Sequence, residues 1–81
     1  ELAERLRKTR DYVLSVPAAA FEGSEAREIT IPRRAGEPLR FDGLNYLRHF
    51  AQPNFYFHAT TTYALLRHAG VPLGKADYLG A

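Results

Sequence analysis

The fold is decided by residues 44–70, whose sequence is LNYLRHFAQPNFYFHATTTYALLRHAG. At about 100° per residue, one face of a helix over this stretch collects side chains within about 40° of a common direction. They are Leu47, Ala51, Asn54, His58, Thr62 and Leu65. Gly70 is a residue that commonly ends helices. We therefore predict one long helix over about 44–69 with this stripe facing inwards. Pro53 should kink it near Gln52 or split it into two helices.

The remaining chain predicts one further helix and a β-hairpin. Residues 1–16 place largely apolar side chains three and four apart, and Pro17 ends that helix. Residues 28–31 and 39–42 alternate between polar and apolar around a connection rich in proline and glycine. This pattern is typical of a hairpin over about 28–42. Residues 70–81 are expected to form a short apolar tail that lies back along the bundle.

Composition indicates one ordinary globular domain and excludes several classes of function. The chain has 81 residues, of which 46% are hydrophobic, enough for a core but not for two domains. There is no cysteine, so disulfides, thiolate nucleophiles and cysteine metal ligands are excluded. The net charge is only +2, and the basic residues are interspersed with acidic ones, which argues against a nucleic-acid partner. No apolar run approaches the roughly 18 residues of a membrane span, and we expect a cytoplasmic protein.

Two helices and a hairpin cannot bury both of their apolar stripes. Two stripes that face each other leave their flanks in water, whereas a four-helix bundle covers them. The sequence therefore predicts that the chain is completed by further helices of its own protein or by a second copy. Because the chain begins directly in a helical pattern, we expect an N-terminal segment to be missing from it.

Four segments carry a resemblance to a known family. They are residues 21–25 (FEGSE), 41–43 (FDG), 52–71 (QPNFYFHATTTYALLRHAGV) and 73–80 (LGKADYLG). In them the chain resembles the domain-of-unknown-function family DUF1993, which is itself similar to the DinB/YfiT-like superfamily. The resemblance implies an all-α fold: an up-down four-helix bundle, to which residues 1–81 contribute the C-terminal half with a small hairpin between two helices. The N-terminal half of the same protein would supply the other helices, and a homodimer is expected.

Many members of that superfamily bind a divalent metal through three histidines. Two of these stand four apart on the last helix, and an Arg-Gly-Gln sequence follows them. By resemblance, His58 corresponds to the second histidine of the pair, but Asn54 occupies the position of the first. Residues 59–61 are Ala-Thr-Thr in place of Arg-Gly-Gln. A neutral amide oxygen is a poor zinc ligand, and a catalytic site needs about three protein ligands.

Four side chains of the long helix are therefore candidates for lining a pocket: Asn54, His58, Thr61 and Thr62. His58 is either a metal ligand or a structural, pocket-lining histidine, and the second interpretation is favoured. Asn54 either bonds to His58 or caps the backbone kink next to the proline, and again the second is favoured. The threonine hydroxyls either bond to carbonyls one turn back or line a polar cleft.

Other polar and aromatic residues have more ordinary interpretations. Tyr56 and Tyr63 stand seven apart on the predicted outward face, which favours a contact between helices or subunits. His49 should face solvent. Asp42 and Asp77 lie near the ends of predicted segments, as helix caps or solvated surface groups do.

Two functions follow from the sequence. The first is a small-molecule-binding or structural DinB-like bundle without a cofactor. The alternative is an enzyme that depends on a divalent metal such as zinc or nickel, a thiol-linked transferase or isomerase using His58 with ligands from the missing half. Whether the protein is an enzyme stays open at this point.

Overall fold

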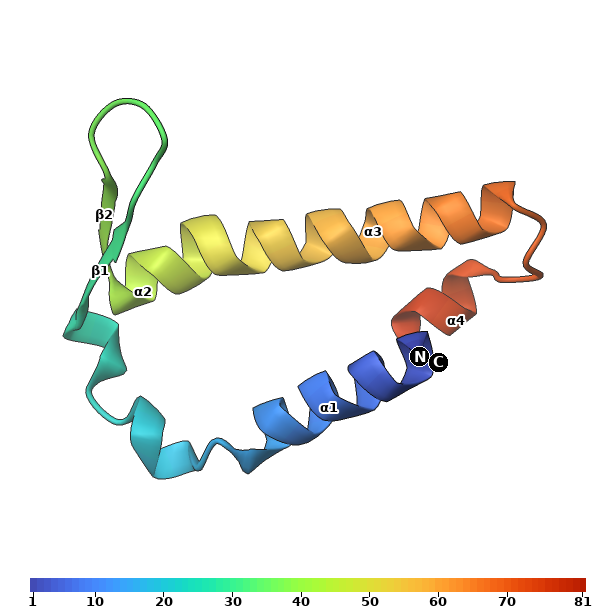
Figure 1. Cartoon of the computed structure of the whole chain (residues 1–81), viewed down its shortest axis with the longest axis horizontal. Helices are drawn as coiled ribbons and strands as arrows, with labels where there is room; N and C mark the ends of the chain where they lie inside the picture. Colours follow the sequence, from blue (N-terminus) through green and yellow to red (C-terminus); the bar gives the residue numbers. More distant parts are fainter. The chain divides into compact units, whose positions relative to one another are not determined.

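The computed structural model describes all 81 residues, and it is mostly helical (64%) with one two-stranded antiparallel sheet. The chain forms two compact units, residues 1–44 and residues 45–81. The first contains helix α1 and the hairpin, and the second contains the long helix from Asn45 onwards and a short C-terminal helix (Figure 1). None of the helices combines the length and apolarity that crossing a membrane requires.

Helix α1 spans Leu2–Ser15, which confirms the helix predicted at the start of the chain. It ends where Val16 takes an extended conformation ahead of Pro17, as expected for a residue that precedes a proline. Two ion pairs lie within the helix: Glu4 with Arg7 at 3.0 Å and Arg10 with Asp11 at 3.1 Å. The large apolar side chains of this helix are exposed rather than packed into a core.

Two short 3-10 turns connect α1 to the hairpin: η1 (Ala18–Phe21) and η2 (Ser24–Ala26). Gly23 lies between them with φ of 73°, in the left-handed region that glycine adopts without a steric penalty. The turn brings the chain into the first strand, and Arg27 has already returned to an extended conformation.

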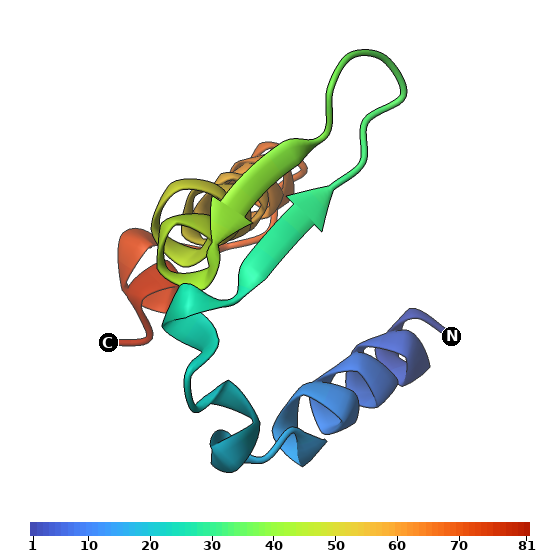
Figure 2. The ribbon, with the colours of Figure 1, turned by 90° about the vertical axis from the view of Figure 1, so that its left-hand side faces the viewer.

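The predicted hairpin is confirmed and consists of β1 (Glu28–Ile31) and β2 (Leu39–Asp42). Glu28 pairs with Asp42 and Ile31 pairs with Leu39, so the alternation gives the hairpin one apolar and one polar face. The apolar face is half-buried and holds Ile29, Ile31, Leu39 and Phe41. The polar face is exposed and holds Glu28, Thr30, Arg40 and Asp42. Figure 2 shows the two strands side by side, with the connecting loop at their far end.

The long helix is helical throughout, as predicted, but it is not uniform. It consists of α2 (Gly43–Tyr46), a π-helical turn η3 (Leu47–Ala51) and α3 (Gln52–His68). Pro53 lies in the first turn of α3, so the irregularity that we expected near Gln52 takes the form of a π turn ahead of the proline. A π turn holds one more residue than an α turn. The π turn therefore displaces Leu47 from the stripe predicted at 100° per residue, whereas Ala51, which directly precedes α3 in an α conformation, stays in line with it.

The C-terminal tail contains a helix that we did not predict, α4 (Lys75–Leu79). The backbone N–H of Gly74 donates to the Asp77 carboxylate over 2.8 Å, which caps the first turn. Asp77 is thus a helix cap, one of the two roles expected for it. Gly80, with φ of 69°, ends the helix in a left-handed conformation.

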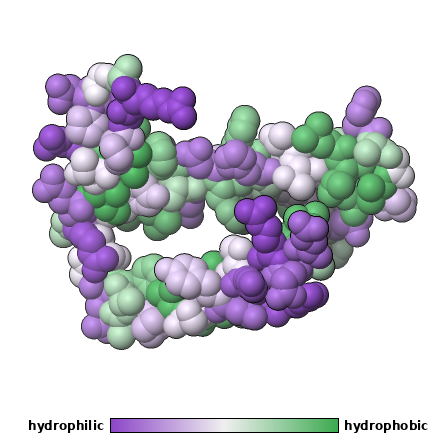
Figure 3. All heavy atoms as spheres, in the orientation of Figure 1, coloured by the Kyte–Doolittle hydropathy of each residue, from purple (hydrophilic) through white to green (hydrophobic).

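No side chain of the chain is buried, and the predicted inward stripe is open to solvent. Leu47 is 48% exposed and Leu65 is 63% exposed. Figure 3 shows hydrophobic side chains at the surface near the C-terminal end of α3. A folded domain normally covers such residues, so these apolar faces are surfaces for packing.

Candidate functional site

The four candidate pocket residues lie on α3, between its first turn and its middle. Asn54, His58 and Thr62 follow one another at intervals of four, and Thr61 stands next to this line, three residues after His58. At these spacings their side chains emerge from the same side of the helix. All four are exposed. The sequence thus brings them together on one helix face, but whether that face lines a pocket stays a prediction.

The side chain of Asn54 is hydrogen-bonded to the backbone close to Pro53. Its side-chain amide donates to the carbonyl of Phe50 over 2.8 Å, one turn back. This confirms the interpretation of Asn54 as a cap for the irregular turn and not as a hydrogen-bond partner of His58. The side chain keeps its neutral amide oxygen and its second amide N–H for a ligand.

His58 is the one strong donor to a metal on this face. Its ring packs edge-on against Phe57, with centroids 5.2 Å apart and an interplanar angle of 86°. Thr62 donates its hydroxyl to the backbone carbonyl of His58 over 2.8 Å, as expected for a threonine inside a helix. The imidazole nitrogens of His58 are therefore not held by the threonine side chain.

The residues present do not make a metal centre. No group of three histidine, cysteine, aspartate or glutamate side chains lies close enough to hold a metal ion. A catalytic zinc site takes three protein ligands, themselves held by hydrogen bonds, and the α3 face supplies one histidine and one amide oxygen. No metal-dependent step can be derived from this donor set.

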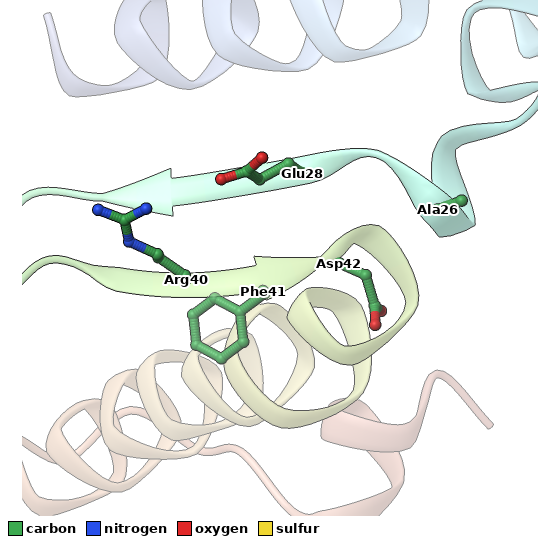
Figure 4. A pocket seen from close by; sticks show the side chains of 5 residues that line it. All are labelled: Ala26, Glu28, Arg40, Phe41 and Asp42. Atoms are coloured by element: carbon green, nitrogen blue, oxygen red, sulfur yellow. The ribbon is translucent and has the colours of Figure 1, made fainter.

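A second polar site lies on the hairpin and was missed in the sequence. An open hollow of about 290 Å³ is lined by Ala26, Glu28, Arg40, Phe41 and Asp42 (Figure 4). Glu28 and Asp42 are direct cross-strand partners, and like charges in this position repel. Arg40 lies on the same face, opposite Thr30. The strand alternation was visible in the sequence, but the register that places the two carboxylates opposite each other was not.

A third cluster joins α4 to α3. The hydroxyls of Thr60 and Tyr78 lie 3.1 Å apart, and the Tyr78 ring meets Tyr63 edge-on at 5.7 Å. Arg67 donates to the Tyr63 hydroxyl over 3.3 Å. Tyr63 thus makes the contact between helices that its position on the outward face predicted. For Tyr56, which is 56% exposed, a contact with a partner stays a prediction.

Comparison with known proteins identifies the family. A family model described as a domain of unknown function (DUF1993) matches residues 1–79. The chain belongs to this family. No curated protein and no solved structure matches it.

Two of the segments by which this DUF1993 chain resembles its family meet in space. Gly43, from the FDG segment, lies so close to Ser24, from the FEGSE segment, that a Cβ on Gly43 would overlap the Ser24 carbonyl group. Gly23 supplies the left-handed turn that leads into Ser24. The two segments are therefore one structural unit, which fixes where α2 begins and holds it to η2.

Proposed function

We propose that this DUF1993 chain is part of a DinB-like four-helix bundle that contains no catalytic metal and binds a small molecule on the α3 face. The observation that carries the proposal is the state of the side chains on that face. Asn54 and Thr62 are bonded to backbone carbonyls, and His58 alone remains as a strong ligand. Such a face can offer hydrogen bonds to a neutral polar molecule, but it cannot by itself grip a metal ion.

The exposed apolar surface supports the bundle. Phe55, Phe57 and Leu65 on α3 are 66%, 64% and 63% exposed. Small-molecule sites in helical bundles lie between helices and combine apolar walls with a few polar groups. The N-terminal half of the same protein is the proposed source of the other helices, and a homodimer is the proposed assembly. His58, Asn54 and Thr61 then become the polar groups of an otherwise apolar pocket.

Solvent mapping of the full-length protein by NMR tests the pocket. We expect acetamide and propan-2-ol, added in turn as small polar probes, to perturb the amide signals of Asn54, His58 and Thr61 in a saturable way. His58→Ala should weaken the response to acetamide by about fivefold, the effect of losing one hydrogen bond. His49→Ala is the matched control and should leave it unchanged.

The hollow on the hairpin provides the internal comparison. Its amides, such as those of Glu28 and Arg40, should shift linearly and weakly with probe concentration, as an open surface does. Saturable binding at the hairpin together with no response on α3 would refute the proposed pocket. If His49→Ala and His58→Ala responded equally to acetamide, His58 would not be part of the pocket.

A further inference from the structure

The π-helical turn η3 contains more backbone acceptors than donors. The N–H of Gln52 donates to the Leu47 carbonyl, five residues back. Ala51 is the N-cap of α3, so its carbonyl accepts the first α-helical bond. The carbonyls of residues 48, 49 and 50 lie between these two bonds, and the amides available to them are those of residues 53 and 54. Because Pro53 has no N–H, three carbonyls share a single backbone donor.

Asn54 supplies a second donor at this point. Its Nδ2 atom lies 2.8 Å from the Phe50 carbonyl oxygen, one of the three acceptors. The rings of Tyr46 and Phe50 also stack across the turn, with centroids 5.5 Å apart and planes inclined by 26°. The π register is thus stabilised by a side-chain bond and a ring contact at the place where the backbone ladder is incomplete.

We propose that Pro53 and Asn54 together form a register lock that holds η3 in its π conformation. Pro53 lacks the backbone N–H that a regular α register needs. The side-chain amide of Asn54 donates to one of the three carbonyls that share a single backbone donor in the π register. Asn54 is therefore a positioning residue. One residue of register corresponds to about 100° around the helix axis. The lock sets where Tyr46 and Leu47 lie around the axis relative to the His58 face of α3.

Thr62 makes the same type of side-chain bond to a backbone carbonyl, but in a regular part of the helix. Its hydroxyl donates to the carbonyl of His58, also four residues back and also over 2.8 Å. That bond lies inside regular α3, where the backbone ladder is complete. Thr62→Ala is therefore the matched control for Asn54→Ala.

Amide hydrogen exchange of the full-length protein, followed by NMR, tests the lock. Asn54→Ala should accelerate exchange of the Gln52 amide about fivefold, because the π turn loses one of its stabilising bonds. Thr62→Ala should leave the Gln52 amide within twofold of the wild-type rate. Equal effects of the two substitutions, or no effect of Asn54→Ala, would overturn the proposal.

Substitution of the proline provides a second test that does not depend on Asn54→Ala remaining folded. Pro53→Ala restores the missing donor, so the amide of residue 53 should be protected and the turn should become α-helical. In that background Asn54→Ala should leave Gln52 exchange unchanged, since the compensation is no longer required. An unprotected amide at position 53, or an undiminished effect of Asn54→Ala in the double variant, contradicts the lock.

Discussion

The isolated 81-residue chain should unfold without a cooperative transition when it is monomeric. A fully buried leucine or phenylalanine stabilises a fold by about 1.5–3 kcal/mol, against roughly 1–2 kcal/mol of backbone entropy lost per ordered residue. No side chain of this chain is buried, and Leu6 and Phe55 are 64% and 66% exposed. Without a core, the helices should melt gradually over a wide range of temperature.

Circular dichroism at several concentrations, with the molecular mass followed by sedimentation, measures this. A broad, non-sigmoidal decrease of the helical signal in the monomer is the expected result. A cooperative transition that appears only with dimerisation, or only when the N-terminal half is added, agrees with it and identifies the partner. A sharp two-state melt of the monomer would show that the chain folds alone and would refute the half-bundle account.

The second large effect is expected at Gly43. A methyl group there overlaps the backbone carbonyl of Ser24, and a backbone atom cannot move aside as the end of a side chain can. Gly43→Ala must therefore separate the start of α2 from the η2 turn. Overpacking of this kind costs about 1–3 kcal/mol and occasionally more. We expect the upper end of that range, measured as the free energy of unfolding of the full-length protein in urea.

Gly74→Ala is the matched control for Gly43→Ala. Gly74 has φ of −129°, and the one atom within contact range of an added Cβ is a carboxylate oxygen of Asp77 at 3.9 Å. This substitution should cost no more than about 1 kcal/mol, because alanine is a poorer N-cap than glycine but meets no backbone atom here. Equal stability of the Gly43→Ala and wild-type proteins would show that the two family segments are not held together.

The elements with strong local signals were predictable from the sequence. Alternation over residues 28–31 and 39–42, with prolines and a glycine between them, specified the hairpin, because period-two patterns determine which side chains share a sheet face. Pro17 specified the end of α1 for an equally local reason. Asn54 was also predictable, because an asparagine side chain beside a proline in a helix can donate to a backbone carbonyl one turn back.

Features that depend on register were not predictable. A uniform 100° per residue placed Leu47 in line with His58, whereas the π turn adds one residue between Leu47 and α3. Helix α4 has only five residues, too few to show a period, and its signal was the aspartate three residues after Gly74. The contact of Gly43 with Ser24 joins segments 19 residues apart, and no local rule connects them.

Elemental analysis of the full-length, untagged protein after mild purification tests the central claim, a bundle without a catalytic metal, most directly. We predict no near-stoichiometric divalent ion in wild type, His58→Ala or His49→Ala, even after incubation with zinc, nickel or manganese. The contradicting result is a near-stoichiometric ion that is lost in His58→Ala and retained in His49→Ala. That result would make Asn54 a tolerated member of a ligand set completed elsewhere, and it would favour the metal-dependent transferase or isomerase.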